Sequence, residues 1–168
     1  GEGDISKVAS PLDLSLLSCL FEVEKKATLS LEAFDHASAL QETEAFFWSF
    51  CDDYIELVKD RAYKGDQSAL NALRIALDAL LSLFAPFLPF VTEEAWHWAH
   101  PEELSIHLSS WPSPGEAKES PEGFKKAALF LSLLRKEKSE RKVSLKTEVE
   151  NALLFKVILV CGFVKLIL

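Results

Sequence analysis

Apolar residues recur at helical spacing along most of the chain and predict a bundle of helices. Ser10, Pro11 and Asp13 predict the start of a helix. The serine side chain can cap the free N–H groups of the first turn, proline suits the first helical position, and the aspartate side chain can accept from the serine N–H. The first helix is expected over residues 11–26, with this inward stripe: Leu12, Leu16, Cys19, Leu20 and Val23. A longer second helix is expected over residues 30–63, with this stripe: Phe47, Cys51, Tyr54, Val58 and Ala62.

The next segment contains two helices joined by a proline corner. Lys64-Gly65-Asp66 predicts a turn with a glycine cap. A third helix should follow over residues 68–84, with its stripe at Leu70, Leu73, Leu77, Leu80 and Phe84. The run FAPFLPFVTEEAW, residues 84–96, then stays apolar through two prolines, so the backbone must turn while buried. Thr92 is expected to cap a short helix over residues 93–100, with Glu93 and Glu94 in its first turn.

The last third of the chain changes in character. Residues 101–120 are rich in proline, serine and glutamate and predict a loop, which Ile106 and Trp111 are expected to fix to the core. A further helix should begin at residues 120–122 and bury Phe124, Ala127, Ala128, Leu131 and Leu134. The apolar tail, residues 152–168, predicts one or two buried strands. Membrane insertion is the weaker alternative, because the tail is short for a span and is interrupted by Lys156 and Lys165.

Composition and charge narrow the picture. The 168 residues carry 49% hydrophobic residues, enough for one core, with a net charge of −8. All of that charge lies in residues 1–66, which hold 14 acids and 6 bases, whereas residues 118–146 hold nine bases and four acids. A basic segment in an acidic protein can still bind phosphates, because binding follows the local potential. A solvated helix face explains the basic segment equally well.

Cysteine usage and the chain's ends give weaker indications. Cys19, Cys51 and Cys161 lack metal-binding or paired spacing and predict reduced, buried thiols. The chain begins with glycine and contains no methionine, so we expect a piece of a longer protein. No secretory signal pattern is present at its start, which favours the cytoplasm.

Three motifs in order carry a family resemblance. FFWSFCDDYIELVKDRAY spans residues 46–63, the proline corner follows, and Ser105-Ile106-His107 with Trp111-Pro112 comes last. Together they resemble the helical anticodon-binding domain of the class I aminoacyl-tRNA synthetases, over residues 11–150, and are most similar to the bacterial valine-specific members. The resemblance implies a mainly helical bundle over residues 1–115, with a helix and a small β or mixed appendage over 116–168.

Catalysis is not expected from this segment, although the resemblance makes it part of a ligase. Neither the HIGH-type nor the KMSKS-type signature of the family occurs; residues 142–146, KVSLK, are only a faint echo of the second. Glu93, His97 and His100 suggest a metal site weakly, because no further histidine or cysteine has ligand spacing. Adjacent Asp52 and Asp53 diverge around a helix and do not share a site. No cofactor is expected in this fragment, and ATP and Mg²⁺ are implied for the whole enzyme.

RNA binding is the function that the resemblance implies. Single-stranded loop bases are stacked on aromatic rings, while cations hold the phosphates. The candidates on the long helix and the later basic helix are Trp48, Asp52, Tyr54, Lys59, Arg61, Lys64, Arg135, Lys136 and Lys138. Core packing or solvation is the alternative for each. Residues assigned to architecture, with no RNA contact, are Phe84, Pro86, Phe87, Pro89, Glu94, Trp96, His107 and Trp111.

The implied partners are the anticodon stem-loop of tRNA(Val) and the catalytic and editing domains of the same enzyme. The enzyme is expected to be monomeric and not to associate with a membrane. Two alternatives stay open at this point. One is the equivalent domain of an isoleucyl, leucyl, methionyl or cysteinyl enzyme. The other is a helical protein-interaction module that has lost RNA binding, for which the acidic first half is the argument.

Overall fold

The computed structural model describes residues 3–116 and 118–144. They form helices joined by turns and loops, with no strand among the described residues. The chain divides into two compact units, Gly1–Ala128 and Leu129–Leu168. The prediction of a mainly helical protein is confirmed. The predicted strands of the tail, residues 152–168, lie outside the described residues, as does Cys161.

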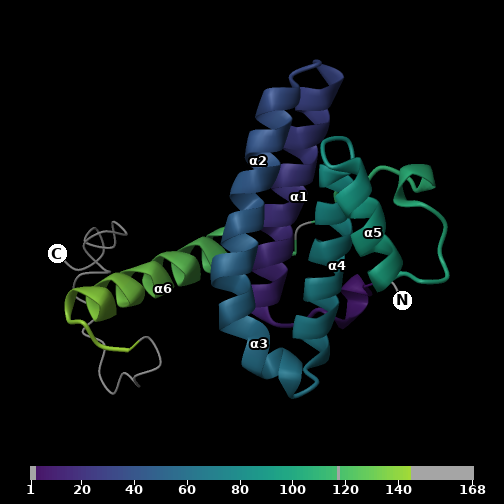
Figure 1. Ribbon diagram of the computed structural model, residues 1–168. Coiled ribbons are helices and arrows are strands. Elements are labelled where there is room, and N and C mark those ends of the chain that lie inside the picture. Colours follow the sequence, from purple (N-terminus) through teal and green to yellow (C-terminus); the bar gives the residue numbers. More distant parts are fainter. Residues whose placement is uncertain (1–2, 117, 145–168) are drawn as a thin grey trace. The chain divides into compact units, whose positions relative to one another are not determined.

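Helix α1 (Pro11–Glu32) is the centre of the first unit. Its consecutive residues Ser15 to Phe21 are all buried, so this helix is covered on every side and not along one stripe only. Figure 1 shows α2 and α4 on either side of α1. A short 3₁₀ turn, Ile5–Lys7, precedes the helix.

The break between the first two helices was predicted in the wrong place. Helix α1 continues to Glu32, and α2 (His36–Ser49) begins only after Ala33-Phe34-Asp35. No glycine or proline interrupts the chain between residues 26 and 33, so nothing ends the helix earlier. Phe34 makes the turn with a φ of 59°, a left-handed conformation that is uncommon outside glycine. The Asp35 side chain then accepts a hydrogen bond from the Ser38 N–H and caps α2.

Helix α2 continues through a π-helical segment, Phe50–Tyr54, into α3 (Ile55–Tyr63). From Phe46 onward the buried residues are Phe46, Phe50, Tyr54 and Val58, each four positions after the last. A regular α-helix would rotate such positions steadily off the core face, because its repeat is about 3.6 residues. The π-helical turn adds a residue and offsets this rotation. The rings of Phe50 and Tyr54 consequently stack, with centroids 5.8 Å apart.

The turn into α4 (Gln67–Phe84) confirms the predicted Lys64-Gly65-Asp66 signal. Gly65 has a φ of 81°, and the Asp66 side chain caps the new helix by accepting from the Ala69 N–H at 3.0 Å. The predicted leucine stripe is only partly inward. The most buried positions are Ala69, Ala72, Ala76, Leu80 and Leu83, whereas Leu77 is 42% exposed. Helix α4 contacts α1, and its buried alanines are small enough to allow close packing between helices.

The chain turns at the two prolines as predicted, but the prediction of a buried turn is wrong: Leu88 is 49% exposed, Phe90 88% and Val91 65%. The helix cap is not the predicted one either. Helix α5 (Pro89–Ala99) begins at Pro89, which tolerates the first helical position because it has no N–H to satisfy. Thr92 is therefore inside the helix, and its hydroxyl donates to the Leu88 carbonyl at 2.9 Å. Figure 1 shows α5 returning alongside α4. Trp96 packs there with Ala85 and Ile106 in a second small core.

Glu93, predicted for the first turn of that helix, instead holds the following loop. Its carboxylate accepts hydrogen bonds from the Ser105 hydroxyl at 2.8 Å and the Ile106 N–H at 3.1 Å, where a short 3₁₀ turn, Ile106–Leu108, begins. The loop over residues 101–120 is thus confirmed. Ile106 is buried, and Trp111 is fixed by a hydrogen bond while keeping 38% of its surface exposed.

Helix α6 (Glu122–Glu140) starts in the first unit and ends in the second. Phe124 is buried against Tyr54, and its N–H donates to the Ser15 hydroxyl at 2.7 Å. The division proposed from the sequence, at residues 115 and 116, stays a prediction. Cys19 and Cys51 are free thiols; Cys19 is buried as predicted, whereas Cys51 is only half-buried. None of the helices formed by the described residues is long and apolar enough to cross a membrane.

Candidate nucleic-acid interface

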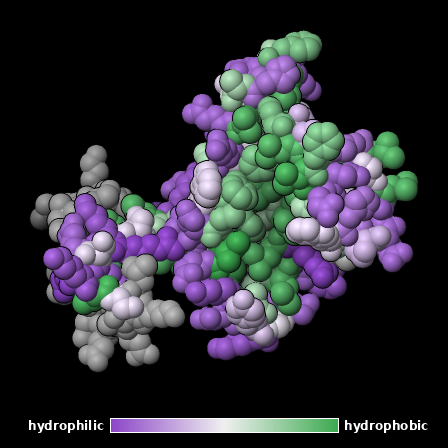
Figure 2. Space-filling model, in the orientation of Figure 1, coloured by the Kyte–Doolittle hydropathy of each residue, from purple (hydrophilic) through white to green (hydrophobic). Residues whose placement is uncertain are grey.

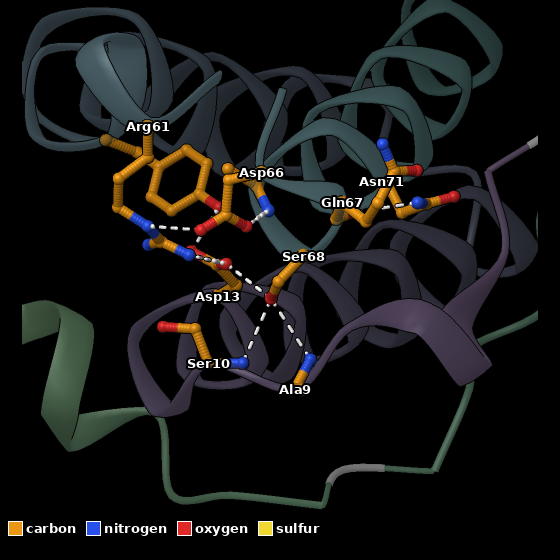
Figure 3. Close-up of polar contacts among 10 residues, drawn as sticks. Ala9, Ser10, Asp13, Arg61, Asp66, Gln67, Ser68 and Asn71 are labelled. Atoms are coloured by element: carbon orange, nitrogen blue, oxygen red, sulfur yellow. Dashed lines mark hydrogen bonds and ion pairs between the residues drawn. The ribbon is translucent and has the colours of Figure 1, made fainter. Parts of the chain in front are cut away.

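A buried carboxylate organises the end of the bundle where α1, α3 and α4 meet (Figure 3). Asp13 is fully buried and accepts hydrogen bonds from the Tyr54 hydroxyl at 2.8 Å and the Ser68 hydroxyl at 2.6 Å. Arg61 donates two more hydrogen bonds to the Asp13 carboxylate, from Nη1 to Oδ1 at 3.1 Å and from Nη2 to Oδ2 at 2.8 Å. A buried charge is tolerated when a cation and several donors satisfy it, which is the case here.

Ser68 extends this network to the start of α1. Its hydroxyl oxygen accepts from the N–H groups of Ala9 at 3.0 Å and Ser10 at 2.9 Å (Figure 3). The expected capping box is therefore wrong: Ser10 makes no side-chain cap, and Asp13 turns inward to the network. The physical reason is that α3 and α4 supply Asp13 with stronger partners than a helix N-terminus offers.

Two predicted RNA-binding residues belong to this network. Tyr54 has no exposed surface, so it cannot stack on a base, and that prediction is wrong. Burial is the main cause that raises the pKa of its hydroxyl, and the neighbouring Asp13 adds to it. Arg61 also pairs with Asp66 through Nε at 3.1 Å, so its guanidinium is committed to two carboxylates. Its hydrogen bonds to Asp13 are the main cause that raises the pKa of Arg61.

Other candidates remain at the surface. Trp48, on α2, is 55% exposed and meets Phe47 edge to face, with ring centroids 5.3 Å apart. Asp52, in the π-helical segment, is also exposed. Figure 2 shows apolar side chains gathered over α2 and α4 on the face in view. Phe47 of α2 also meets Phe84 of α4 edge to face, with ring centroids 5.6 Å apart. Trp48 therefore offers an accessible aromatic ring.

The end of α3 provides the cations. Lys59 is partly exposed and pairs with Glu56, with Nζ to Oε1 at 2.8 Å, and this hydrogen bond is the main cause that raises the pKa of the lysine. Lys64 is exposed at the turn before Gly65. Tyr63 lies between them in sequence and is 90% exposed. Sequence reasoning missed Tyr63, although an aromatic residue directly before a helix-ending Lys-Gly pair is a signal that could have found it.

The second set of candidates lies on the part of α6 in the second unit. Lys136 is exposed, with Nζ 4.0 Å from Glu140 Oε1, while Arg135 and Lys138 are partly exposed. Their approach to RNA stays a prediction.

A metal site at Glu93, His97 and His100 is not supported. His97 Nε2 lies 3.1 Å from Glu93 Oε1, whereas His100 Nε2 is 2.8 Å from Asp78 Oδ1, so the two imidazoles have separate partners. Across residues 3–116 and 118–144, no group of three or more histidine, cysteine or acidic side chains is arranged to hold a metal ion.

Comparison with known proteins gives this surface its context. The family model described as the anticodon-binding domain of tRNA ligase matches residues 13–153. A valine–tRNA ligase from Tropheryma whipplei (strain Twist) is 47% identical over 147 residues, which cover 87% of this chain and 17% of that enzyme. Valine–tRNA ligases from Leifsonia xyli and Thermobifida fusca are also 47% identical, over 162 and 157 residues. The chain spans 18% of the length of each of these two enzymes and covers no catalytic core. It belongs to the family of anticodon-binding domains of tRNA ligases.

Proposed function

We propose that this chain is the part of a valine–tRNA ligase that binds the anticodon stem-loop of tRNA(Val). The observation that carries the proposal is the 47% identity to valine enzymes over 147 residues. Two features of the structure support it. Trp48 presents an exposed ring, and the end of α3 presents Tyr63 with Lys59 and Lys64, which is the combination of stacking groups and cations that loop RNA requires.

The whole enzyme would join L-valine to its tRNA, using ATP and Mg²⁺. Those groups would act in a catalytic domain outside this chain, so no step of the reaction is assigned to residues described here. The catalytic and editing domains are the proposed protein partners, in a monomeric cytoplasmic enzyme. The apolar surface over α2 and α4 in Figure 2 supports such contacts, because extended exposed apolar patches mark interaction surfaces.

The test is binding of the full chain to a short RNA hairpin that carries a valine anticodon, at low and at moderate salt. A matched hairpin with its middle anticodon base changed is the control. We expect tighter binding of the valine hairpin at both salt concentrations. Equal binding of both hairpins, lost steeply with salt, would show only attraction to phosphates and would contradict anticodon recognition.

A further inference from the structure

A cleft of about 370 Å³ lies on the first unit, between α1 and the loop that follows the 3₁₀ turn Ile106–Leu108. Its walls are mainly apolar, with a few polar groups at the edge. Helix α1 lines it with Lys25, Thr28 and Leu29, and the loop lines it with Trp111, Pro112 and Pro114. Mostly apolar walls with a small number of polar groups are typical of ligand sites.

The loop wall of this cleft is held against α1 at two points. Trp111 Nε1 donates to Thr28 Oγ1 at 2.8 Å, and the Thr28 hydroxyl donates in turn to the Glu24 carbonyl at 2.7 Å. Gly115 lies so close to Phe21 that a Cβ there would be 2.6 Å from the ring carbon Cζ. Phe21 and Thr28 are two turns apart on α1, so the loop runs along this helix and Trp111 is oriented before any ligand arrives.

The hydrogen bond to Thr28 determines which contacts Trp111 can make with a ligand. Because its only donor is committed to Thr28, the indole has no hydrogen bond left to donate to a ligand, so what it can offer is apolar and aromatic contact. The side chain is 38% exposed, and Leu29, 56% exposed, forms part of the same cleft. Stacking on an aromatic ring accepts any nucleobase, because every base has a π face.

Charge around the cleft favours a nucleotide over an uncharged ring. Lys25 lines the cleft and is exposed. The next residue, Lys26, is instead engaged by Glu42, with Nζ to Oε2 at 3.5 Å. A lysine beside an aromatic ring supplies a positive charge for the phosphate of a nucleotide whose base stacks on that ring.

We propose that this cleft binds one unstacked nucleotide of single-stranded RNA, with its base against Trp111 and its phosphate at Lys25. The proposal rests on the proposed function and adds a base-binding position to it. The sequence assigned Trp111 to architecture; the hydrogen bond to Thr28 agrees with that role, and the exposed face adds a second one.

The experiment measures binding of the valine-anticodon hairpin to the full chain and to three variants. Trp111→Leu should weaken binding about tenfold, because it removes the aromatic ring on which a base stacks, and Trp111→Phe should restore most of the affinity. Lys25→Gln should weaken binding and reduce the salt slope by about 0.7. The matched control is Lys26→Gln, one position away and outside the cleft lining, which should bind nearly as the unmodified chain does.

A nuclear magnetic resonance titration keeps the test independent of the stability of Trp111→Leu. In the unmodified chain, the indole N–H signal assigned through Trp111→Phe should shift as the hairpin is added. Unchanged affinity in Lys25→Gln, together with an unshifted indole signal, would overturn the proposal while the proposed function stood. If the unmodified chain binds no hairpin at all, both fail together.

Discussion

Arg61 and Asp13 form a two-point ion pair, Nη1 to Oδ1 at 3.1 Å and Nη2 to Oδ2 at 2.8 Å, between α3 and α1. Asp13 is fully buried, whereas the Arg61 side chain keeps 32% of its surface exposed. The pair joins residues 48 positions apart, and Asp66 adds a second carboxylate to the same guanidinium. Arg61 thus fixes the end of α3, whose exposed neighbours are the proposed RNA contacts.

Removing the arginine should destabilise the chain strongly. In Arg61→Ala, the carboxylate of Asp13 would stay buried without its cation, which typically costs about 3–5 kcal/mol. Urea unfolding followed by circular dichroism measures the change in the free energy of unfolding. Lys64→Ala, three residues later at an exposed position, is the control and should change it by less than about 0.5 kcal/mol. Equal stability of the two variants would show that the ion pair contributes nothing.

Tyr54→Phe separates a role in stability from a role in RNA binding. The change removes only the hydroxyl that donates to Asp13 at 2.8 Å. A hydrogen bond to a charged group is worth about 2 kcal/mol. We expect lower stability in urea and an unchanged affinity for the valine-anticodon hairpin, because the ring is buried. The matched variant is Tyr63→Phe, at a 90% exposed position, which should leave stability unchanged. Weaker hairpin binding by folded Tyr54→Phe would contradict the internal role.

The helix boundaries show where sequence reasoning succeeds. The turn at Lys64-Gly65-Asp66 was predictable because a glycine with a φ of 81° and an aspartate cap are local signals. The turn at Phe34 was not, because a phenylalanine takes the left-handed conformation there and no glycine marks it. Alanine and leucine stripes both recur at helical spacing in α4, so periodicity alone could not show that the alanines are the more buried of the two.

The candidate site was harder to predict than the fold. Trp48 and Lys64 are exposed, as an RNA contact requires, but Tyr54 and Arg61 are engaged by Asp13, 41 and 48 positions away. A motif along one helix contains no information about such distant partners. Trp111 was assigned to structure for the complementary reason: its exposed face depends on how the loop lies against α1.

The two lysines at the end of α3 should differ in their effect on RNA binding. Lys64→Ala should lower hairpin affinity and reduce the salt slope by about 0.7, as for the loss of one single-strand phosphate contact. The Lys59 side chain is held by Glu56 at 2.8 Å. Glu56→Gln should therefore release this lysine and tighten binding by on the order of twofold at low salt. Affinity measured at several salt concentrations checks both. A salt slope that Lys64→Ala leaves unchanged would place the phosphate elsewhere.

Glu24 should make the stability of the chain depend on pH. Glu24 is 3% exposed, its Oε2 atom has no hydrogen-bond partner among the residues that the structure describes, and burial raises its pKa from 4.5 to about 7. Between these values the folded chain binds the proton more tightly than the unfolded chain. Stability therefore falls as the pH rises from 4.5 to about 7 and stays lower above that.

Comparison with Glu24→Gln isolates this effect, because the variant has no proton to lose at residue 24. Groups such as Asp66, whose pKa is lowered mainly by the Ala69 N–H, act in the opposite direction but equally in both proteins. We expect the free energy of unfolding of the unmodified chain to fall, relative to the variant, by up to about 3 kcal/mol between about pH 4.5 and about pH 8. Urea unfolding at half-unit pH steps measures the difference. Two parallel curves would mean that Glu24 keeps an ordinary pKa and that its buried oxygen is hydrated.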